Sequence, residues 1–165
     1  MGVAQQTIKE LTDVSLDDSI RIIRSAFGKV AGELGITLEN APVFPAFVTR
    51  EKLDEMKARG AVFFGLFSNG SQVGVVALEK EASGEYYMKR LAVLPEYWRG
   101  GLGRNLVDHV IDYARKLGIK KIHIAMVNEQ AVLKSWYRGM GFRETAIKKF
   151  AHLPFSVCFM EMDIV

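Results

Sequence analysis

Three glycines within four positions, Gly100, Gly101 and Gly103, lie between the apolar segment Leu91–Val93 and a strongly helical pattern. Glycine leaves the backbone N–H groups unobstructed, and the positive end of a helix dipole lies directly behind them. Such a strand–glycine–helix junction is suited to bind an anion, above all a phosphate. The segment Arg99–Arg104 is therefore predicted to be a phosphate-binding loop.

Other glycine-rich motifs fit this loop less well. A P-loop requires Lys followed by Ser or Thr after the glycines, and none follows here. A dinucleotide-binding motif requires a third glycine where Leu106 stands, and three antiparallel strands are predicted before the loop. A structural tight turn is the remaining alternative, but a strand, a glycine loop and an amphipathic helix in succession favour an anion site.

The elements around the loop follow from periodicity and turn signals. A helix is predicted from an N-cap at Ser15 to Gly28, then a loop or broken helix over residues 29–49, then a helix over 49–60. Asn69-Gly70 marks a hairpin between two apolar runs. The remaining predictions are strands at 7–11, 61–67, 72–79, 86–93, 121–127, 142–150 and 157–164, and helices at 102–117 and from about 129 to 140. This order predicts an α+β fold with a mixed, mostly antiparallel sheet and helices on both faces.

Composition limits the classes of function. The 165 residues predict one domain, residues 1–165, and no apolar run approaches the roughly 20 residues that span a bilayer. Residues 1–6 lack a signal-peptide pattern, so a cytoplasmic protein is expected. The only cysteine, Cys158, is expected to be a buried strand residue, which excludes an internal disulfide and a thiolate metal cluster. A net charge of +3 without a basic run or recognition motif argues against nucleic acid as the partner.

The chain resembles the GCN5-related N-acetyltransferases (GNAT), which are acyl-coenzyme A-dependent. The resemblance is sharpest in Leu91–Tyr97 (Leu-Ala-Val-Leu-Pro-Glu-Tyr), Gly100–Leu106 (Gly-Gly-Leu-Gly-Arg-Asn-Leu) and Trp136–Phe142 (Trp-Tyr-Arg-Gly-Met-Gly-Phe). The loop departs from the family in one respect, because Trp98 stands where a Gln or Arg is usual. The resemblance implies an acyl-CoA N-acyltransferase-like fold with a splayed parallel strand pair at its centre.

The resemblance also implies a ligand and a mechanism. Acetyl-coenzyme A would be the acyl donor, its pyrophosphate on the loop amides and its pantetheine along the strand before the loop. A primary amine, of a small molecule or a peptide, would attack the thioester directly through a tetrahedral intermediate, whose oxyanion the Val93 amide could stabilise. No metal is implied. The coenzyme-binding residues would be Leu91, Ala92, Val93, Arg99, Gly100, Gly101, Leu102, Gly103, Arg104 and Asn128.

Tyr137 matches the family tyrosine that protonates the leaving thiolate, although an aromatic core residue is the alternative. The role of Asn128 is also open, because it could equally be a helix N-cap. No general base is assigned, and a water-relayed base or capture of the neutral amine remains open. The acidic candidates Glu79, Glu81 and Glu85, and the imidazoles of His123 and His152, are each read more simply as structural.

By the same resemblance the acceptor pocket lies between the first two helices, the middle strands and the last hairpin. Core packing is the alternative for these residues, and no arginine set demands a phosphorylated or carboxylated acceptor. Exposed strand edges permit a homodimer. A coenzyme A-binding sensor without turnover is the alternative function. The pocket residues would be Phe27, Phe44, Phe47, Tyr87, His152 and Phe155.

Overall fold

The computed structural model describes residues 5–12 and 16–165. Helices and strands follow one another in the predicted order, and two short 3-10 turns are added; the predicted N-cap Ser15 lies outside the described residues. The elements are β1 (Gln6–Glu10), α1 (Leu16–Leu34), η2 (Pro45–Phe47), α2 (Arg50–Ala58), β2 (Val62–Ser68), β3 (Ser71–Lys80), β4 (Tyr86–Val93), η3 (Pro95–Tyr97), α3 (Leu102–Lys116), β5 (Lys121–Val127), α4 (Ala131–Gly139), β6 (Arg143–Lys149) and β7 (Ser156–Asp163).

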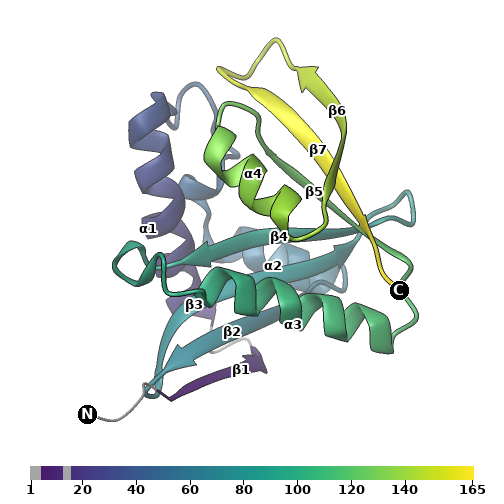
Figure 1. The fold of residues 1–165 in the computed structure, drawn as a ribbon. Helices are drawn as coiled ribbons and strands as arrows, with labels where there is room; N and C mark the ends of the chain where they lie inside the picture. Colours follow the sequence, from purple (N-terminus) through teal and green to yellow (C-terminus); the bar gives the residue numbers. More distant parts are fainter. Residues whose placement is uncertain (1–4, 13–15) are drawn as a thin grey trace.

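Within the described residues, seven strands form one sheet in the order β1-β2-β3-β4-β5-β7-β6. Every neighbouring pair is antiparallel except β4 and β5, which are parallel and joined through α3. Figure 1 shows α3 and α4 in front of the sheet and α1 and α2 behind it. The predicted fold class is therefore confirmed. No helix in the described part of the chain is long and apolar enough to cross a membrane.

The first helix is longer than its glycines suggest. The sequence predicts an end at Gly28, but α1 continues through Gly28 and Gly32 to Leu34, so this boundary is wrong. A glycine inside a helix costs about 1 kcal/mol relative to alanine. Packing outweighs that cost, because the buried face of α1 extends past Gly28 as far as Ala31. The turn comes at Gly35, whose φ of +66° ends the helix.

The centre of the sheet is opened by a β-bulge in β4. Val75 lies opposite Ala92 and Ala77 lies opposite Lys89, so two residues of β4 face Val76 alone. One of them is Arg90, whose φ of +57° is unusual for a side chain other than glycine. Beyond the bulge β4 turns away from β5.

The parallel pairing is accordingly short. It covers only Tyr86 with Ile122 and Tyr87 with His123, whereas β5 pairs with β7 along its full length. The predicted splaying of the two central strands is thus present, and the bulge is its structural cause.

A buried carboxylate links β3 to β4 and to the end of α2. Glu79 on β3 is 2% exposed, and it accepts from Lys89 Nζ at 2.7 Å and from Arg59 Nε at 3.0 Å. Burial raises its pKa, but the hydrogen bonds and charges of Lys89 and Arg59 outweigh burial and hold the pKa of Glu79 below its usual value. Glu79 is therefore ionised at neutral pH and fully engaged, which makes it a poor proton acceptor.

Replacing Glu79 with glutamine should lower the free energy of unfolding at pH 7 by about 2 kcal/mol, because two cations lose their buried partner. Since the folded pKa lies below the unfolded value of about 4.3, this stabilisation is complete above that pH and disappears as pH falls through the folded pKa. Urea unfolding at pH 7 and pH 3 measures the difference. The exposed Glu55→Gln is the control and should change stability by less than about 0.5 kcal/mol; a Glu79→Gln deficit that persists at pH 3 would contradict the assignment.

Candidate functional site

The helix start after the glycine loop has free backbone donors. Gly101 is the N-cap of α3, with a left-handed φ of +79° and no capping side chain. Asn105 is the first amide of this helix to find an acceptor, the Gly101 oxygen at 3.1 Å. The amides from Gly101 to Arg104 have no hydrogen-bond partner among the described residues. Unpaired donors at the positive end of a long helix make an anion site.

Gly103 allows α4 to pack closely against the start of α3. A Cβ on Gly103 would come within 3.4 Å of the Trp136 ring, so the absence of a side chain leaves the indole of α4 in contact with the first turn of α3. Gly101 faces open space, and its positive φ is strained for any residue with a Cβ. The helix start that the sequence predicts after the glycines is therefore present and has no side-chain cap.

The end of β4 offers a second row of backbone groups. Leu94 N donates to Val73 O at 2.9 Å, so the backbone of Leu94 and of Ala92 points toward β3. Because alternate residues of a strand point to opposite neighbours, Val93 directs its N–H and C=O groups away from β3, on the side of β5, while Leu91 lies within the bulge. Trp98 confirms this direction, since its Nε1 donates to Val93 O at 2.6 Å.

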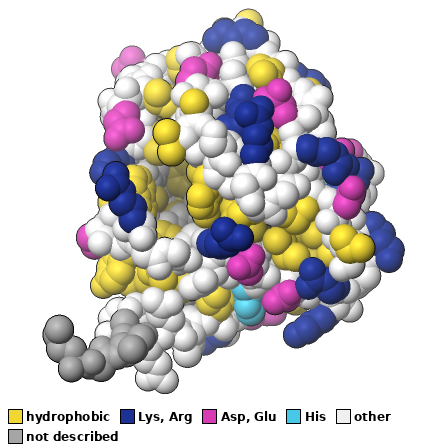
Figure 2. Space-filling view, in the orientation of Figure 1, with side chains coloured by type: hydrophobic (Ala, Val, Ile, Leu, Met, Phe, Trp, Pro, Cys, Tyr) yellow, Lys and Arg dark blue, Asp and Glu magenta, His cyan; other side chains and the backbone are white. Residues whose placement is uncertain are grey.

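The face of the molecule seen in Figure 1 has a hollow. Figure 2 shows hydrophobic side chains gathered in a depression between the regions of α1 and α4. Trp98 borders the glycine loop beside it, and Lys29 of α1 lies 4.8 Å from the centroid of the Trp98 ring.

Tyr137 lies on α4 and is 7% exposed. Its ring packs edge-on against Trp136 and Phe142, at centroid distances of 5.1 and 5.5 Å. Its hydroxyl has no hydrogen-bond partner among the described residues, and burial raises the pKa of Tyr137 well above its usual value. The phenol therefore remains a proton donor throughout the physiological range.

The side chain of Asn128 contacts Lys134 and does not cap α4. The N-cap of α4 is Gln130, so the N-cap alternative for Asn128 is wrong. Its Oδ1 accepts a hydrogen bond from Lys134 Nζ, which also contacts Glu144 at 2.9 Å. Asn128 stands at the end of β5, beside the gap, where its backbone N is tied to Ser156 O at 2.8 Å.

Four of the six predicted acceptor residues are brought together. Phe44 packs against Phe27 at 5.7 Å and against Phe155 at 5.8 Å between ring centroids, and Phe47 joins the same small core. These rings come from α1, from the segment before α2 and from the last hairpin. The exposed His152 lies against Phe150 instead.

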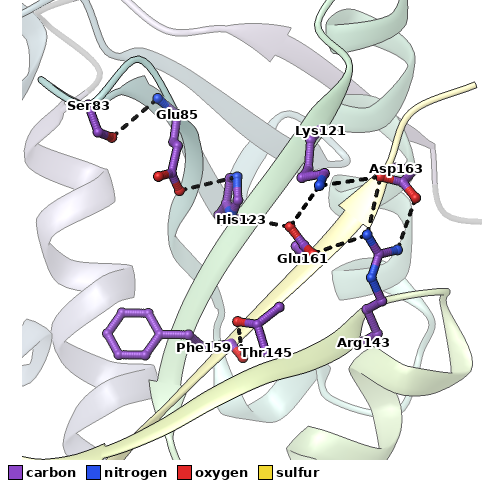
Figure 3. A network of polar contacts seen from close by, with 9 residues as sticks. All are labelled: Ser83, Glu85, Lys121, His123, Arg143, Thr145, Phe159, Glu161 and Asp163. Carbon is purple, nitrogen blue, oxygen red and sulfur yellow. Dashed lines mark hydrogen bonds and ion pairs between the residues drawn. The ribbon is translucent and has the colours of Figure 1, made fainter.

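Tyr87 lies elsewhere in the sheet. Its ring stacks on His123 at 5.2 Å, at the end of β4 that pairs with β5. Val93 is six residues further along the strand, which corresponds to about 20 Å. Figure 3 shows His123 between two carboxylates, with its Nε2 at 3.3 Å from Glu85 and its Nδ1 at 3.9 Å from Glu161. His123 and Glu85 are thereby engaged in a structural network far from the open edge.

Cys158 is fully buried in β7, as predicted, and burial raises the pKa of its thiol. Among the described residues, no group of three or more His, Cys, Asp or Glu side chains is arranged to hold a metal ion.

One residue of the site was missed by sequence reasoning. Arg90, at the bulge, turns its side chain toward Phe44 and Phe47, and its Nε is buried without a hydrogen-bond partner. Its position in an alternating strand predicts an ordinary surface arginine. The register shift between Val75 and Ala77 changes the direction of the Arg90 side chain. No local sequence signal predicts that shift.

A model of the acetyltransferase (GNAT) family matches residues 34–142, which is most of the chain and includes the loop, the open edge and Tyr137. The chain belongs to this family. A [ribosomal protein bS18]-alanine N-acetyltransferase of Escherichia coli K12 is 31% identical over 86 residues, covering 52% of this chain and 57% of the relative. A probable N-acetyltransferase camello of Xenopus tropicalis is 26% identical over 124 residues, covering 72% of this chain and 57% of the relative. The matches thus span little more than half the length of these GNAT relatives.

Solved structures share the whole fold. The ribosomal-protein-S18-alanine N-acetyltransferase from Escherichia coli has a TM-score of 0.78 at 22% identity, covering 97% of this chain and 94% of that one. The PaiA N-acetyltransferase from Thermoplasma acidophilum, solved in complex with coenzyme A, also has a TM-score of 0.78, at 21% identity and coverages of 96% and 99%. At these identities the likeness establishes the fold, and the predicted GNAT membership is confirmed.

Proposed function

We propose that this GNAT protein transfers acetyl from acetyl-coenzyme A to a primary amine by direct attack. The observation that carries the proposal is the exposed backbone edge at Leu91–Val93 immediately before the uncapped start of α3. A diphosphate on the helix start and a pantetheine arm along the edge satisfy both sets of donors at once. The uncapped amides and the side-chain-free Gly103 fit such a ligand.

The amides from Gly101 to Arg104 hold the diphosphate. Each charge-assisted hydrogen bond of this kind contributes roughly 1.5–3 kcal/mol. Arg99 and Arg104 are exposed at the two ends of the loop and add positive charge near the phosphates. The coenzyme supplies the activated acetyl thioester.

The Val93 amide faces the gap and can donate to the oxyanion that forms when the amine attacks. Removing one such donor typically costs about 100-fold to 1,000-fold in turnover. Tyr137 then donates its proton to the departing thiolate. The indole of Trp98 donates to Val93 O and so fixes that part of the edge. In this proposal the pantetheine arm binds beside it.

The pH dependence of the reaction follows from the absence of an assigned base. If the neutral fraction of the amine is captured, log(kcat/KM) rises by about one per pH unit below the pKa of the amine and then levels off. The raised pKa of Tyr137 keeps the phenol protonated, so no fall in rate is expected up to about pH 9. Two acceptors whose amine pKa values differ by more than one unit provide the test. A plateau that begins at the same pH for both acceptors would instead indicate a base on the enzyme.

The proposed activity is tested by thiol release from acetyl-coenzyme A with a panel of amines, beside calorimetry of acetyl-coenzyme A binding. The panel should include peptides with an N-terminal alanine, since that residue is named for the bS18 relatives. Turnover with any amine supports the transferase. Binding without turnover on every amine, and without slow hydrolysis, favours a coenzyme A sensor. The engagement of Glu79 in ion pairs, and the contact of Glu85 with His123, is the observation that keeps this second function open.

A further inference from the structure

A cavity of about 200 Å³ lies behind the bulge of β4. Its walls come from the segment before η2, from the first turn of α2 and from β4 itself. Most of the lining is apolar, and the only charged groups in it are two cations. The residues that matter for its chemistry are Phe44, Phe47, Val48, Thr49, Lys52 and Arg90.

Arg90 is the unusual member of this lining. Its Nε has no hydrogen-bond partner and no contact with solvent. Burial lowers the pKa of Arg90 below its usual value, opposed by Glu79 and reinforced by Arg59. The nearby carboxylate of Glu79 accepts from Lys89 and Arg59, and among the described residues the Arg90 Nε donates neither to it nor to another acceptor. A buried guanidinium nitrogen without an acceptor is costly, so its retention calls for a ligand.

We propose that the cavity at Arg90 binds a carboxylate of the acceptor, so that the substrate is a small amine which carries both a carboxylate and an apolar group. The inference rests on the proposed acetyl transfer and narrows its substrate class. The planar guanidinium fork matches a carboxylate with two parallel hydrogen bonds. Phe44 and Phe47 provide the apolar wall beside it.

The charges around the cavity support an anion over a polyamine. Lys52 is the second cation of the lining, and its Nζ lies 3.7 Å from Glu55, which leaves Arg90 as the cation without an ion-pair partner. Along β4, Arg90 precedes Val93 by three residues, which corresponds to roughly 10 Å. One molecule can therefore place its carboxylate at Arg90 and extend its amine toward the open edge.

Binding at Arg90 can be measured without any turnover. In ¹H–¹⁵N spectra of the protein, the Nε–Hε signal of Arg90, assigned by its loss in Arg90→Gln, should shift on titration with benzoate and stay in place with benzamide. Arg115→Gln is the matched control, since Arg115 is an exposed arginine on α3 paired with Asp112. A signal that ignores benzoate, or that responds to inorganic phosphate and not to benzoate, overturns the carboxylate assignment. This experiment remains decisive even if acetyl transfer is absent.

Kinetics test the same residue as a specificity determinant. Among amino acids and their carboxamides, the wild-type protein should prefer the carboxylates, and Arg90→Gln should raise KM for carboxylates at least tenfold while leaving carboxamides within twofold. Arg90→Lys keeps the charge but loses the planar guanidinium. Its KM for carboxylates should therefore lie between those of the wild type and of Arg90→Gln. A wild-type preference for carboxamides would overturn the proposal.

Stability separates binding from a structural role. Arg90→Gln should leave the thermal midpoint of the ligand-free protein unchanged or higher, because it removes a partly buried charge whose Nε has no hydrogen-bond partner among the described residues. A clear fall in the midpoint would show that Arg90 serves the fold instead.

Discussion

Replacing Gly101 with aspartate should weaken acetyl-coenzyme A binding by at least about 100-fold. The new carboxylate would lie at the uncapped start of α3, accept from the free amides and repel the diphosphate. Two lost charge-assisted hydrogen bonds correspond to about 3–6 kcal/mol, and each 1.4 kcal/mol is a factor of ten in affinity. Isothermal titration calorimetry measures the change directly.

Gly118 offers a closely matched control for this substitution. It lies just beyond the other end of α3, has a φ of +75° and, like Gly101, has open space where a Cβ would be. Gly118→Asp therefore introduces the same side chain into a similar backbone conformation, away from the loop. Its coenzyme affinity should be that of the wild type. If Gly101→Asp and the wild type bind acetyl-coenzyme A with equal affinity, the diphosphate does not bind at the start of α3.

Replacing Tyr137 with phenylalanine should lower kcat by about 100-fold, the lower end of the range for a positioned general acid. The affinity for acetyl-coenzyme A should stay within about twofold, because the phenol contacts the reacting sulfur only as it leaves. The fold should also be retained, since the hydroxyl has no partner among the described residues and both ring contacts persist in phenylalanine. Steady-state kinetics and binding measured together check both parts.

The control for Tyr137 is Tyr113→Phe on α3, whose ring packs against Phe64 at 5.0 Å. It removes a phenol from another helix, where the ring packs on β2, and should keep wild-type kcat. The assignment of Tyr137 fails if Tyr137→Phe turns over at the wild-type rate across the pH range. A loss of coenzyme affinity as large as the loss of kcat would instead point to a packing role.

These predictions concern different parts of one arrangement. In the proposed arrangement the loop before α3 sets the affinity for the coenzyme, Tyr137 sets turnover, and Arg90 sets the choice of amine. Each therefore alters a different measured quantity, and the three variants can be distinguished in a single set of assays. Glu79 affects stability and its pH dependence, because its carboxylate is fully used within the fold.

Local sequence was sufficient to predict the loop and helix start where we propose that the coenzyme binds. The glycine loop, the uncapped helix and the strand before it are contiguous, from Leu91 to Arg104, so their geometry follows from short-range rules about glycine, strand ends and helix starts. The same rules predicted the order of the elements and the class of fold. They failed at α1, where packing against the sheet outweighed the glycine penalty that a local reading emphasises.

The acceptor side was decided by tertiary structure. Phe27, Phe44 and Phe155 are distant in the chain and meet only when α1 and the last hairpin close over the gap. Arg90 was not predicted, because its direction depends on a register shift between β3 and β4 and its missing partner depends on how Glu79 is used. Register and burial are properties of paired strands. A pattern within one strand therefore carries no information about them, and the charge in the cavity became visible only in the folded protein.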